Sequence, residues 1–171
     1  NLGGSVHNAA RSRVPAIIVA GLSPVSTSGE RVGSRTEFIH YTQDTSRQHE
    51  IVAQYMKWCY EIRDAEMTDQ VLLRGLQIAE TEPQGPIYLT GAREVWEEST
   101  KAPRQALAKW RPSKQAGLTP KDLNSLSNAL CSAKRPLIVT SYLGRQTAAV
   151  ERLVQLADLI GIAVCEVNPQ Y

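Results

Sequence analysis

Short apolar runs recur along this chain with helical or polar sequence between them, and this alternation limits the possible folds most strongly. The runs are Ala16–Ala20, Ile87–Leu89, Leu137–Thr140 and Ile162–Val167. They are rich in β-branched residues and lack an alternating polar face, as expected for strands buried on both sides of a parallel sheet. A fifth predicted strand, Trp58–Ile62, has one more polar face. This order of elements is typical of an α/β protein.

Helices are predicted between these strands. The first covers Gly4–Arg13 and ends before Val14-Pro15, because the residue preceding a proline disfavours helical geometry. Thr45 and Gln48 have the spacing of a capping box, which predicts a helix continuing to about Tyr55. Thr68 is expected to cap a third helix, whose apolar stripe consists of Val71, Leu72, Leu76 and Ala79.

The pattern changes between Arg93 and Gly117, where prolines and charges replace any sustained apolar period. Pro103 and Pro112 lie in this stretch, and Trp96 and Trp110 are expected to pack it onto a domain surface. We interpret residues 93–118 as a linker between a first domain, 1–92, and a second, 119–171. Neither end of the chain resembles a natural domain terminus, so we expect an internal fragment of a longer protein.

The last part of the chain reads as a helix followed by a β-α-β unit. Thr119 and Pro120 supply N-cap and first-turn chemistry. The buried stripe of this helix should comprise Leu123, Leu126, Leu130 and Cys131. A further helix, Ala149 to Ile160, is closed by Gly161, and its connection should be right-handed. The sequence therefore predicts two partial doubly wound parallel-sheet domains of the α/β class, joined by a linker.

Charge and hydropathy exclude two classes of partner. A net charge of +2 is too small to indicate nucleic-acid binding, and the densest basic stretch, formed by Arg11, Arg13, Arg31 and Arg35, is expected to be solvated. The longest apolar run, Pro15–Ala20, is far too short to span a bilayer.

The cysteines are scattered singly through the chain. Cys59, Cys131 and Cys165 each have apolar neighbours in sequence, and no pair has metal-ligand spacing. We expect buried free thiols and a reducing, intracellular location, either cytoplasmic or mitochondrial.

Several segments together resemble enzymes dependent on thiamine diphosphate, of the acetolactate synthase (large subunit) type. The resemblance lies in their order and spacing over nearly the whole chain, because each segment alone is common among α/β proteins. The matching segments are Asn1–Pro24, Tyr41–Thr45, Glu82–Leu89, Arg93–Val95, Lys134–Val139 and Leu159–Val164. The first three resemble the second half of the pyrimidine-binding domain of such enzymes, and the last two the start of their central domain.

The resemblance implies a parent enzyme, a transferase or lyase that decarboxylates or joins 2-keto acids such as pyruvate. It implies thiamine diphosphate and Mg²⁺ as cofactors, and a homodimer or tetramer whose subunits share each site. The activating glutamate is expected upstream of Asn1, and the Gly-Asp-Gly metal motif beyond Tyr171. No catalytic residue or metal ligand is therefore assigned here, and the chain alone is expected to be inactive.

Two residues match family positions near the substrate channel. Gln43 could donate a hydrogen bond to a keto or carboxylate oxygen, although an amide that caps a loop is an equal alternative. Lys57 aligns loosely with a lysine at the channel mouth, but an exposed lysine preceding a strand is the favoured interpretation. His7, His40 and His49 have no carboxylate or nucleophile at informative spacing, so surface or packing roles are expected.

Two further features bear on nucleotides. The turn Ser141–Arg145 contains one glycine, where flavin-binding relatives have a glycine-rich loop, which argues against FAD. No Gly-x-Gly-x-x-Gly follows a predicted strand, which disfavours a Rossmann-type nucleotide-binding protein. The remaining alternative is a non-catalytic scaffold or interaction protein that keeps this fold.

Overall fold

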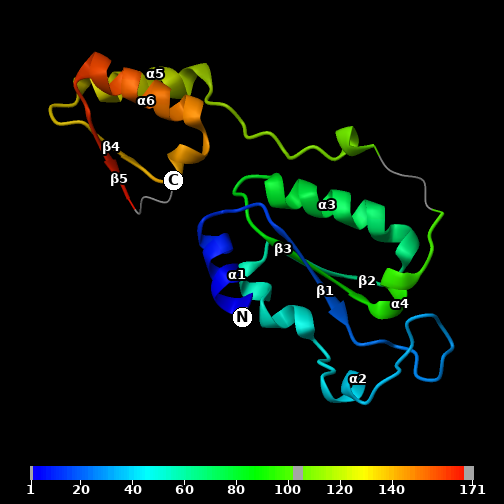
Figure 1. Ribbon diagram of the computed structural model, residues 1–171. Helices are drawn as coiled ribbons and strands as arrows, with labels where there is room; N and C mark the ends of the chain where they lie inside the picture. Colours follow the sequence, from blue (N-terminus) through cyan, green and yellow to red (C-terminus); the bar gives the residue numbers. More distant parts are fainter. Residues whose placement is uncertain (1, 102–105, 168–171) are drawn as a thin grey trace. The chain divides into compact units, whose positions relative to one another are not determined.

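The computed structural model describes residues 2–101 and 106–167, and the chain divides into two compact units (Figure 1). The first unit is Asn1–Gln115 and the second is Ala116–Tyr171. Each contains parallel strands together with helices, which confirms the predicted α/β class with parallel sheets. Among the described residues, no helix is both long enough and apolar enough to cross a membrane.

The first unit is built on a three-stranded parallel sheet. Its strands are β1 (Ile17–Leu22), β2 (Trp58–Ile62) and β3 (Ile87–Ala92), in the spatial order β1-β3-β2. All six residues of the central strand β3 are buried, as a run of apolar residues between two neighbouring strands requires. The three predicted strands are confirmed, with β1 and β3 longer than predicted at their carboxyl ends.

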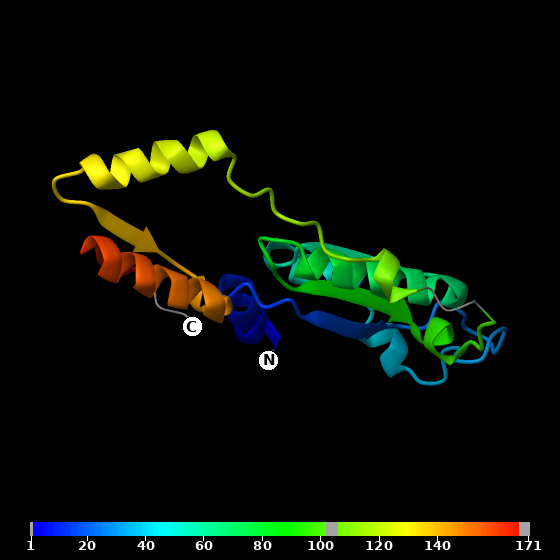
Figure 2. The ribbon, with the colours of Figure 1, turned by 90° about the horizontal axis from the view of Figure 1, so that it is seen from above.

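Helices cover both faces of this sheet, as Figure 2 shows from above. Ile87 and Leu89 of β3 belong to the core that packs against α3 (Thr68–Glu80), whereas Tyr88 packs with Val6 of α1 (Leu2–Arg11). Successive residues of a strand point to opposite faces, so α3 and α1 lie on opposite sides of β3.

The predicted helix from Thr45 to Tyr55 is wrong. The segment forms two short 3₁₀ helices, η1 (Gln48–Ile51) and η2 (Ala53–Tyr55), and neither has a side-chain cap. The Gln48 amide does not close a capping box. It donates instead to the carbonyl of Gly21, 3.1 Å away, and contacts the hydroxyl of Tyr88, also at 3.1 Å. These contacts tie the segment to β1 and β3 and stop a continuous helix.

Four shorter elements complete the first unit: α2 (Ile39–Thr42), η3 (Ala65–Met67), α4 (Arg93–Glu97) and η4 (Leu107–Lys109). The start of α3 also differs from the prediction. The residue that accepts a backbone N–H, from Glu66, is Asp64 at the start of η3, rather than Thr68.

The chain after α4 is attached to the first unit at several points. The Trp96 indole N–H donates to the carbonyl of Gly91 in β3, at 2.8 Å. Further along, the Gln77 amide of α3 donates to the Arg111 carbonyl at 2.9 Å, and the Ser113 N–H donates to the Thr81 hydroxyl at 3.2 Å. Pro103 of the predicted linker lies outside the described residues.

The second unit contains α5 (Pro120–Ser132), β4 (Leu137–Thr140), α6 (Thr147–Ile160) and β5 (Ala163–Glu166), with the short η5 (Leu143–Arg145) before α6. The two strands are parallel neighbours. Thr119 and Asp122 form a capping box at the start of α5, and Gly161 closes α6 in a left-handed conformation with φ of 64°. Both predicted helix boundaries are confirmed.

Apolar side chains of the second unit are largely uncovered. Leu123 and Leu126 are each 50% exposed, so the prediction of a buried stripe on α5 is wrong for this chain by itself. Leu137 and Val139 of β4 are exposed as well. The cysteines are free, as predicted, but they are not buried: Cys59 is half-buried, and Cys131 and Cys165 are exposed.

Candidate functional site

The carboxyl ends of β1 and β3 lead into a group of loops that includes α2. Ligands of open parallel α/β sheets bind outside the carboxyl ends of the strands, so this edge is where a site is sought. The loop that leaves β1 spans residues 23–38 and runs into α2, after which Gln43 and Asp44 follow. We call residues 23–44 the β1 loop.

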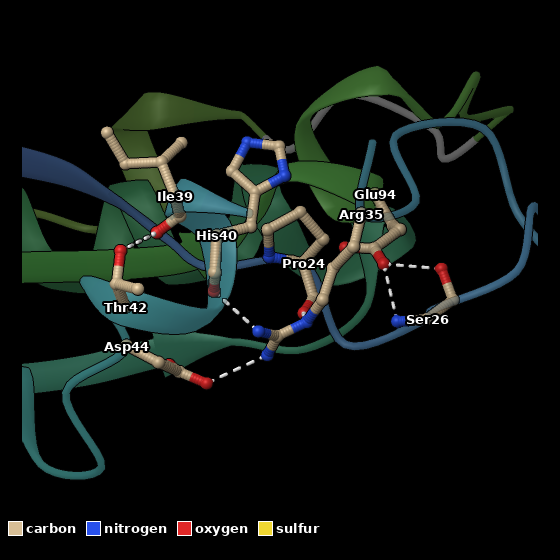
Figure 3. A network of polar contacts seen from close by, with 8 residues as sticks. All are labelled: Pro24, Ser26, Arg35, Ile39, His40, Thr42, Asp44 and Glu94. Atoms are coloured by element: carbon tan, nitrogen blue, oxygen red, sulfur yellow. Dashed lines mark hydrogen bonds and ion pairs between the residues drawn. The ribbon is translucent and has the colours of Figure 1, made fainter. Parts of the chain in front are cut away.

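Glu94 anchors the first part of this loop. Its side chain is almost fully buried, with the residue 3% exposed, and its Oε1 accepts the Ser26 N–H at 2.8 Å and the Ser26 hydroxyl at 2.6 Å (Figure 3). Burial raises the pKa of the Glu94 carboxyl, but the hydrogen bonds from Ser26 outweigh it, and the net pKa is lowered. Glu94 is therefore held as a carboxylate that fixes the loop.

Gly33 brings the far side of the loop against the same residue. Its φ of 90° favours glycine, and a Cβ there would lie 3.0 Å from the Glu94 Cα. The backbone can therefore approach α4 this closely only without a side chain.

Arg35 holds the second part of the loop. Its Nε donates to the Pro24 carbonyl at 2.8 Å, one Nη donates to the His40 carbonyl at 2.5 Å, and the other pairs with the Asp44 carboxylate at 2.8 Å (Figure 3). The guanidinium carbon also lies 4.5 Å from the centre of the Tyr41 ring. The prediction that Arg35 is a solvated residue of a basic stretch is wrong, since its side chain is only 12% exposed.

Gln43 lies inside the segment that Arg35 holds. It is the C-cap of α2, its N–H donates to the Ile39 carbonyl at 3.0 Å, and the residue is exposed. No hydrogen bond of its side-chain amide is found within the described part of the chain. The amide is thus presented to solvent on a fixed backbone.

Lys57 lies elsewhere. It precedes β2, at the edge where the parallel strands begin, and its Nζ donates to the carbonyls of Ile78 and Thr81 at the end of α3, each at 2.5 Å. Burial lowers the pKa of Lys57, and the nearby Glu82 carboxylate opposes this shift. The structure thus gives Lys57 contacts that close a helix and does not bring it together with Gln43. A role for Lys57 in a substrate channel stays a prediction.

The histidines are not arranged as acid–base groups. The His40 Nδ1 accepts the N–H of Thr36 at 3.3 Å, and the His7 ring meets the Tyr55 ring edge-on at 5.6 Å between centroids. His49 contributes its carbonyl, which accepts from the Cys59 thiol at 3.9 Å. These contacts agree with the packing roles expected for them.

Among the cavities of the described residues, one in each unit has a volume of about 470 Å³. The first lies beside the Glu94 anchor and is lined by Arg31, Val32, Glu94, Glu97, Glu98 and Ser99. The second lies between β4, β5 and α6, with Gly144 and Glu166 among its lining residues. Within residues 2–101 and 106–167, no group of three or more histidine, cysteine or acidic side chains could hold a metal ion.

Sequence reasoning missed both Arg35 and Glu94 as organisers of this edge. Arg35 was indistinguishable from its basic neighbours, because its partners Pro24 and Asp44 meet it only through the path of the loop. Glu94 lies in α4, two residues after the end of β3, in a stretch interpreted as linker, and its partner Ser26 is 68 residues away in sequence.

No family model matches the sequence. Solved structures are similar in fold. Benzoylformate decarboxylase from Polynucleobacter necessarius matches 98% of this chain with a TM-score of 0.75 and 20% identity. A thiamine diphosphate-dependent 4-hydroxybenzoylformate decarboxylase from Rhodococcus jostii RHA1 matches 96% with a TM-score of 0.74 and 22% identity. A protein described as a thiamin diphosphate-dependent enzyme, from Mycobacterium smegmatis, matches 96% with a TM-score of 0.68 and 19% identity.

The chain spans 29% of the length of each of the two decarboxylases and 30% of the length of the Mycobacterium smegmatis protein. At 19–22% identity the comparison shows a shared fold over both units of this chain.

Proposed function

We propose that this chain is part of a thiamine diphosphate-dependent 2-keto acid decarboxylase or carboligase of the acetolactate synthase type. One observation carries the proposal: nearly the whole chain, including both units, is similar in fold to part of three solved structures, two of which are described as thiamine diphosphate-dependent enzymes. We assign the first unit to the second half of the pyrimidine-binding domain, and the second unit to the start of the central domain.

Thiamine diphosphate, when bound, supplies the electron sink for decarboxylation of the keto acid. We infer that this chain contributes one wall of the site at the carboxyl edge of the first sheet. Gln43 would donate from its exposed amide to the carboxylate or keto oxygen of a substrate such as pyruvate. Lys57 is the second candidate, although its contacts with Ile78 and Thr81 favour a structural role. We assign the Mg²⁺ ligands and the activating glutamate to polypeptide outside this chain.

We further propose that the site is shared between subunits of a homodimer or tetramer. Uncovered apolar residues in both units mark surfaces that the rest of the longer polypeptide or a second subunit must cover, because monomeric soluble proteins rarely leave large apolar areas exposed. Val19 in β1 is 52% exposed, and Phe38 in the β1 loop is 79% exposed.

The second candidate function is a non-catalytic scaffold that keeps the fold. The polar contacts of Arg35 and Glu94 favour the scaffold, because they hold the β1 loop in place. The two functions differ in one requirement, since only the enzyme needs to bind the cofactor.

The deciding experiment titrates the full-length parent with thiamine diphosphate and Mg²⁺ by isothermal calorimetry, and then measures acetolactate formation from pyruvate. The enzyme predicts saturable binding and turnover, whereas the scaffold predicts neither. Turnover of benzoylformate in place of pyruvate would support the proposed cofactor but contradict the acetolactate synthase type. Titration of residues 1–171 alone should give no tight binding, and tight binding would contradict the assignment of the missing ligands to other polypeptide.

The role of Gln43 is tested by Gln43→Ala in the parent. Removal of a hydrogen bond to a charged substrate group should lower kcat/KM by roughly 10–100-fold, which corresponds to about 1.5–3 kcal/mol. Gln70→Ala is the matched control, because Gln70 is an exposed amide on α3. Equal kinetics for the two variants would exclude Gln43 from substrate binding.

A further inference from the structure

Arg35 is placed to control Gln43 without touching a ligand. We propose that Arg35 is a positioning residue, which fixes the backbone on both sides of Gln43 and so aims its amide at the substrate. The inference rests on the proposed function for the role of Gln43, and on the geometry of the β1 loop for the role of Arg35.

The contacts of Arg35 flank Gln43 in sequence. One Nη is bound to the carbonyl of His40, inside α2, and the other is bound to the carboxylate of Asp44, directly after Gln43. Gln43 is therefore enclosed between two points that are held by the same guanidinium, as Figure 3 shows for His40 and Asp44.

A third contact ties this segment to the sheet. The Arg35 Nε donates to the carbonyl of Pro24, two residues after β1 ends. The planar guanidinium thus links the segment after β1, helix α2 and Asp44 to one another. Its Cζ also lies 4.5 Å from the centre of the Tyr41 ring. An ammonium group has no such planar fork and could not reproduce the three directions together.

Burial of the guanidinium, rather than of its half-exposed carboxylate partner, distinguishes Arg35 from the arginine of an ordinary surface ion pair. The Arg35 side chain is 12% exposed, whereas Arg47, which pairs with Glu50 in η1, is 72% exposed. Exposed pairs of the second kind contribute little to structure. Arg47 is therefore a matched control, being an arginine paired with a carboxylate in the same region.

The segment needs such support because its own structure is weak. Helix α2 has four residues and no side-chain cap, and helices of this length are not stable alone. A displacement of about 1 Å in a substrate-binding group can lower the reaction rate about 100-fold. Loosening of α2 would therefore be felt at the Gln43 amide.

The test uses the full-length parent with Arg35→Lys, Gln43→Ala, the double variant and the control Arg47→Lys. If Arg35 acts through Gln43, Arg35→Lys lowers kcat/KM for pyruvate roughly 10–100-fold, and the double variant is no worse than Gln43→Ala. Losses that multiply in the double variant would overturn the inference. Arg47→Lys should leave the kinetics unchanged.

Hydrogen exchange gives a readout that does not depend on activity. Amides of Ile39–Asp44 should exchange faster in Arg35→Lys than in Arg47→Lys, and unchanged exchange in a folded Arg35→Lys protein would overturn the inference. Should Arg35→Lys fail to fold, Asp44→Asn removes one contact only and should produce a smaller change in the same direction, and no change would again overturn it. Wild-type kinetics for Gln43→Ala would instead reject the proposed role of Gln43, so the two failures are distinguishable.

Discussion

Buried charge in the first unit serves the β1 loop rather than the core. Glu94 is 3% exposed and accepts two hydrogen bonds from Ser26, and Arg35 makes three from the other side of the loop. Removal of one partner from such an arrangement leaves a buried polar group unsatisfied, which costs more than an exposed contact is worth. Single substitutions at these residues should therefore affect the loop strongly.

Glu94→Gln should lower the free energy of unfolding of the first unit by about 1–3 kcal/mol at neutral pH, because the charged acceptor of Ser26 is lost. The pKa of Glu94 is lowered in the folded state, so its contribution is present above the ordinary value of 4.5 and is lost as pH falls through the folded pKa. Wild type and variant should therefore converge in acid. Urea unfolding followed by tryptophan fluorescence measures this, since Trp58, Trp96 and Trp110 all lie in the first unit.

The control for this prediction is Glu97→Gln. Glu97 forms an exposed pair with Arg93 one helical turn away and should contribute little. An equal loss of stability for both variants, or a difference between wild type and Glu94→Gln that persists in acid, would contradict the assigned role of Glu94.

At the scale of elements, strands were predicted better than the segments between them. A strand such as Leu137–Thr140 is encoded by its own β-branched, apolar residues and was found with unchanged bounds. The Thr45–Tyr55 segment carried a local helix signal that contacts of Gln48 with β1 and β3 overrode. Tertiary contacts of this kind are not visible in local patterns.

The candidate site shows the same limit. Gln43 was located from its family position, but the fixing of its backbone by Arg35 depends on where the loop folds back to Pro24. The burial of side chains was also poorly predicted on helix faces that this chain leaves uncovered. The stripe of α5 has the periodicity of a buried helix face, yet Leu123 and Leu126 remain half exposed.

The sheet itself supplies an element-scale prediction. Val19 in β1 and Leu89 in β3 are register partners, but Leu89 is fully buried and Val19 is 52% exposed. Leu89→Ala should cost about 2–5 kcal/mol of unfolding free energy through the cavity it leaves. Val19→Ala should cost less than about 1 kcal/mol. Urea unfolding followed by tryptophan fluorescence measures the loss of unfolding free energy in each variant. Similar losses for the two variants would show that the edge strand β1 is as well packed as the central strand β3.

At the scale of the whole molecule, the two units join just after an attached segment. Arg111 and Ser113 are hydrogen-bonded to Gln77 of α3 and to its C-cap Thr81, whereas Lys114–Leu118 are all exposed. Cleavage by proteases requires local opening of the chain, so the point of attachment should decide where it occurs.

Limited trypsin digestion should therefore cut after Lys114 sooner than after Lys109, and Arg111 is protected by the proline that follows it. Mass spectrometry of the early products identifies the order. Gln77→Ala combined with Thr81→Val removes both contacts with α3 and should speed cleavage after Lys109. Faster cutting at Lys109 in the unaltered chain would show that the segment is not attached as described.

The position of β3 has a consequence for how the chain matures on the ribosome. β1 and β2 emerge first, yet neither pairs with the other, because the strand that both need lies between them in space and after them in sequence. Translation proceeds at about 5–20 residues per second, so β1 waits several seconds for its neighbour. During that interval β1 and β2 both lack the strand that pairs with them in the structure, and their pairing can be completed only after Ala92 has left the exit tunnel.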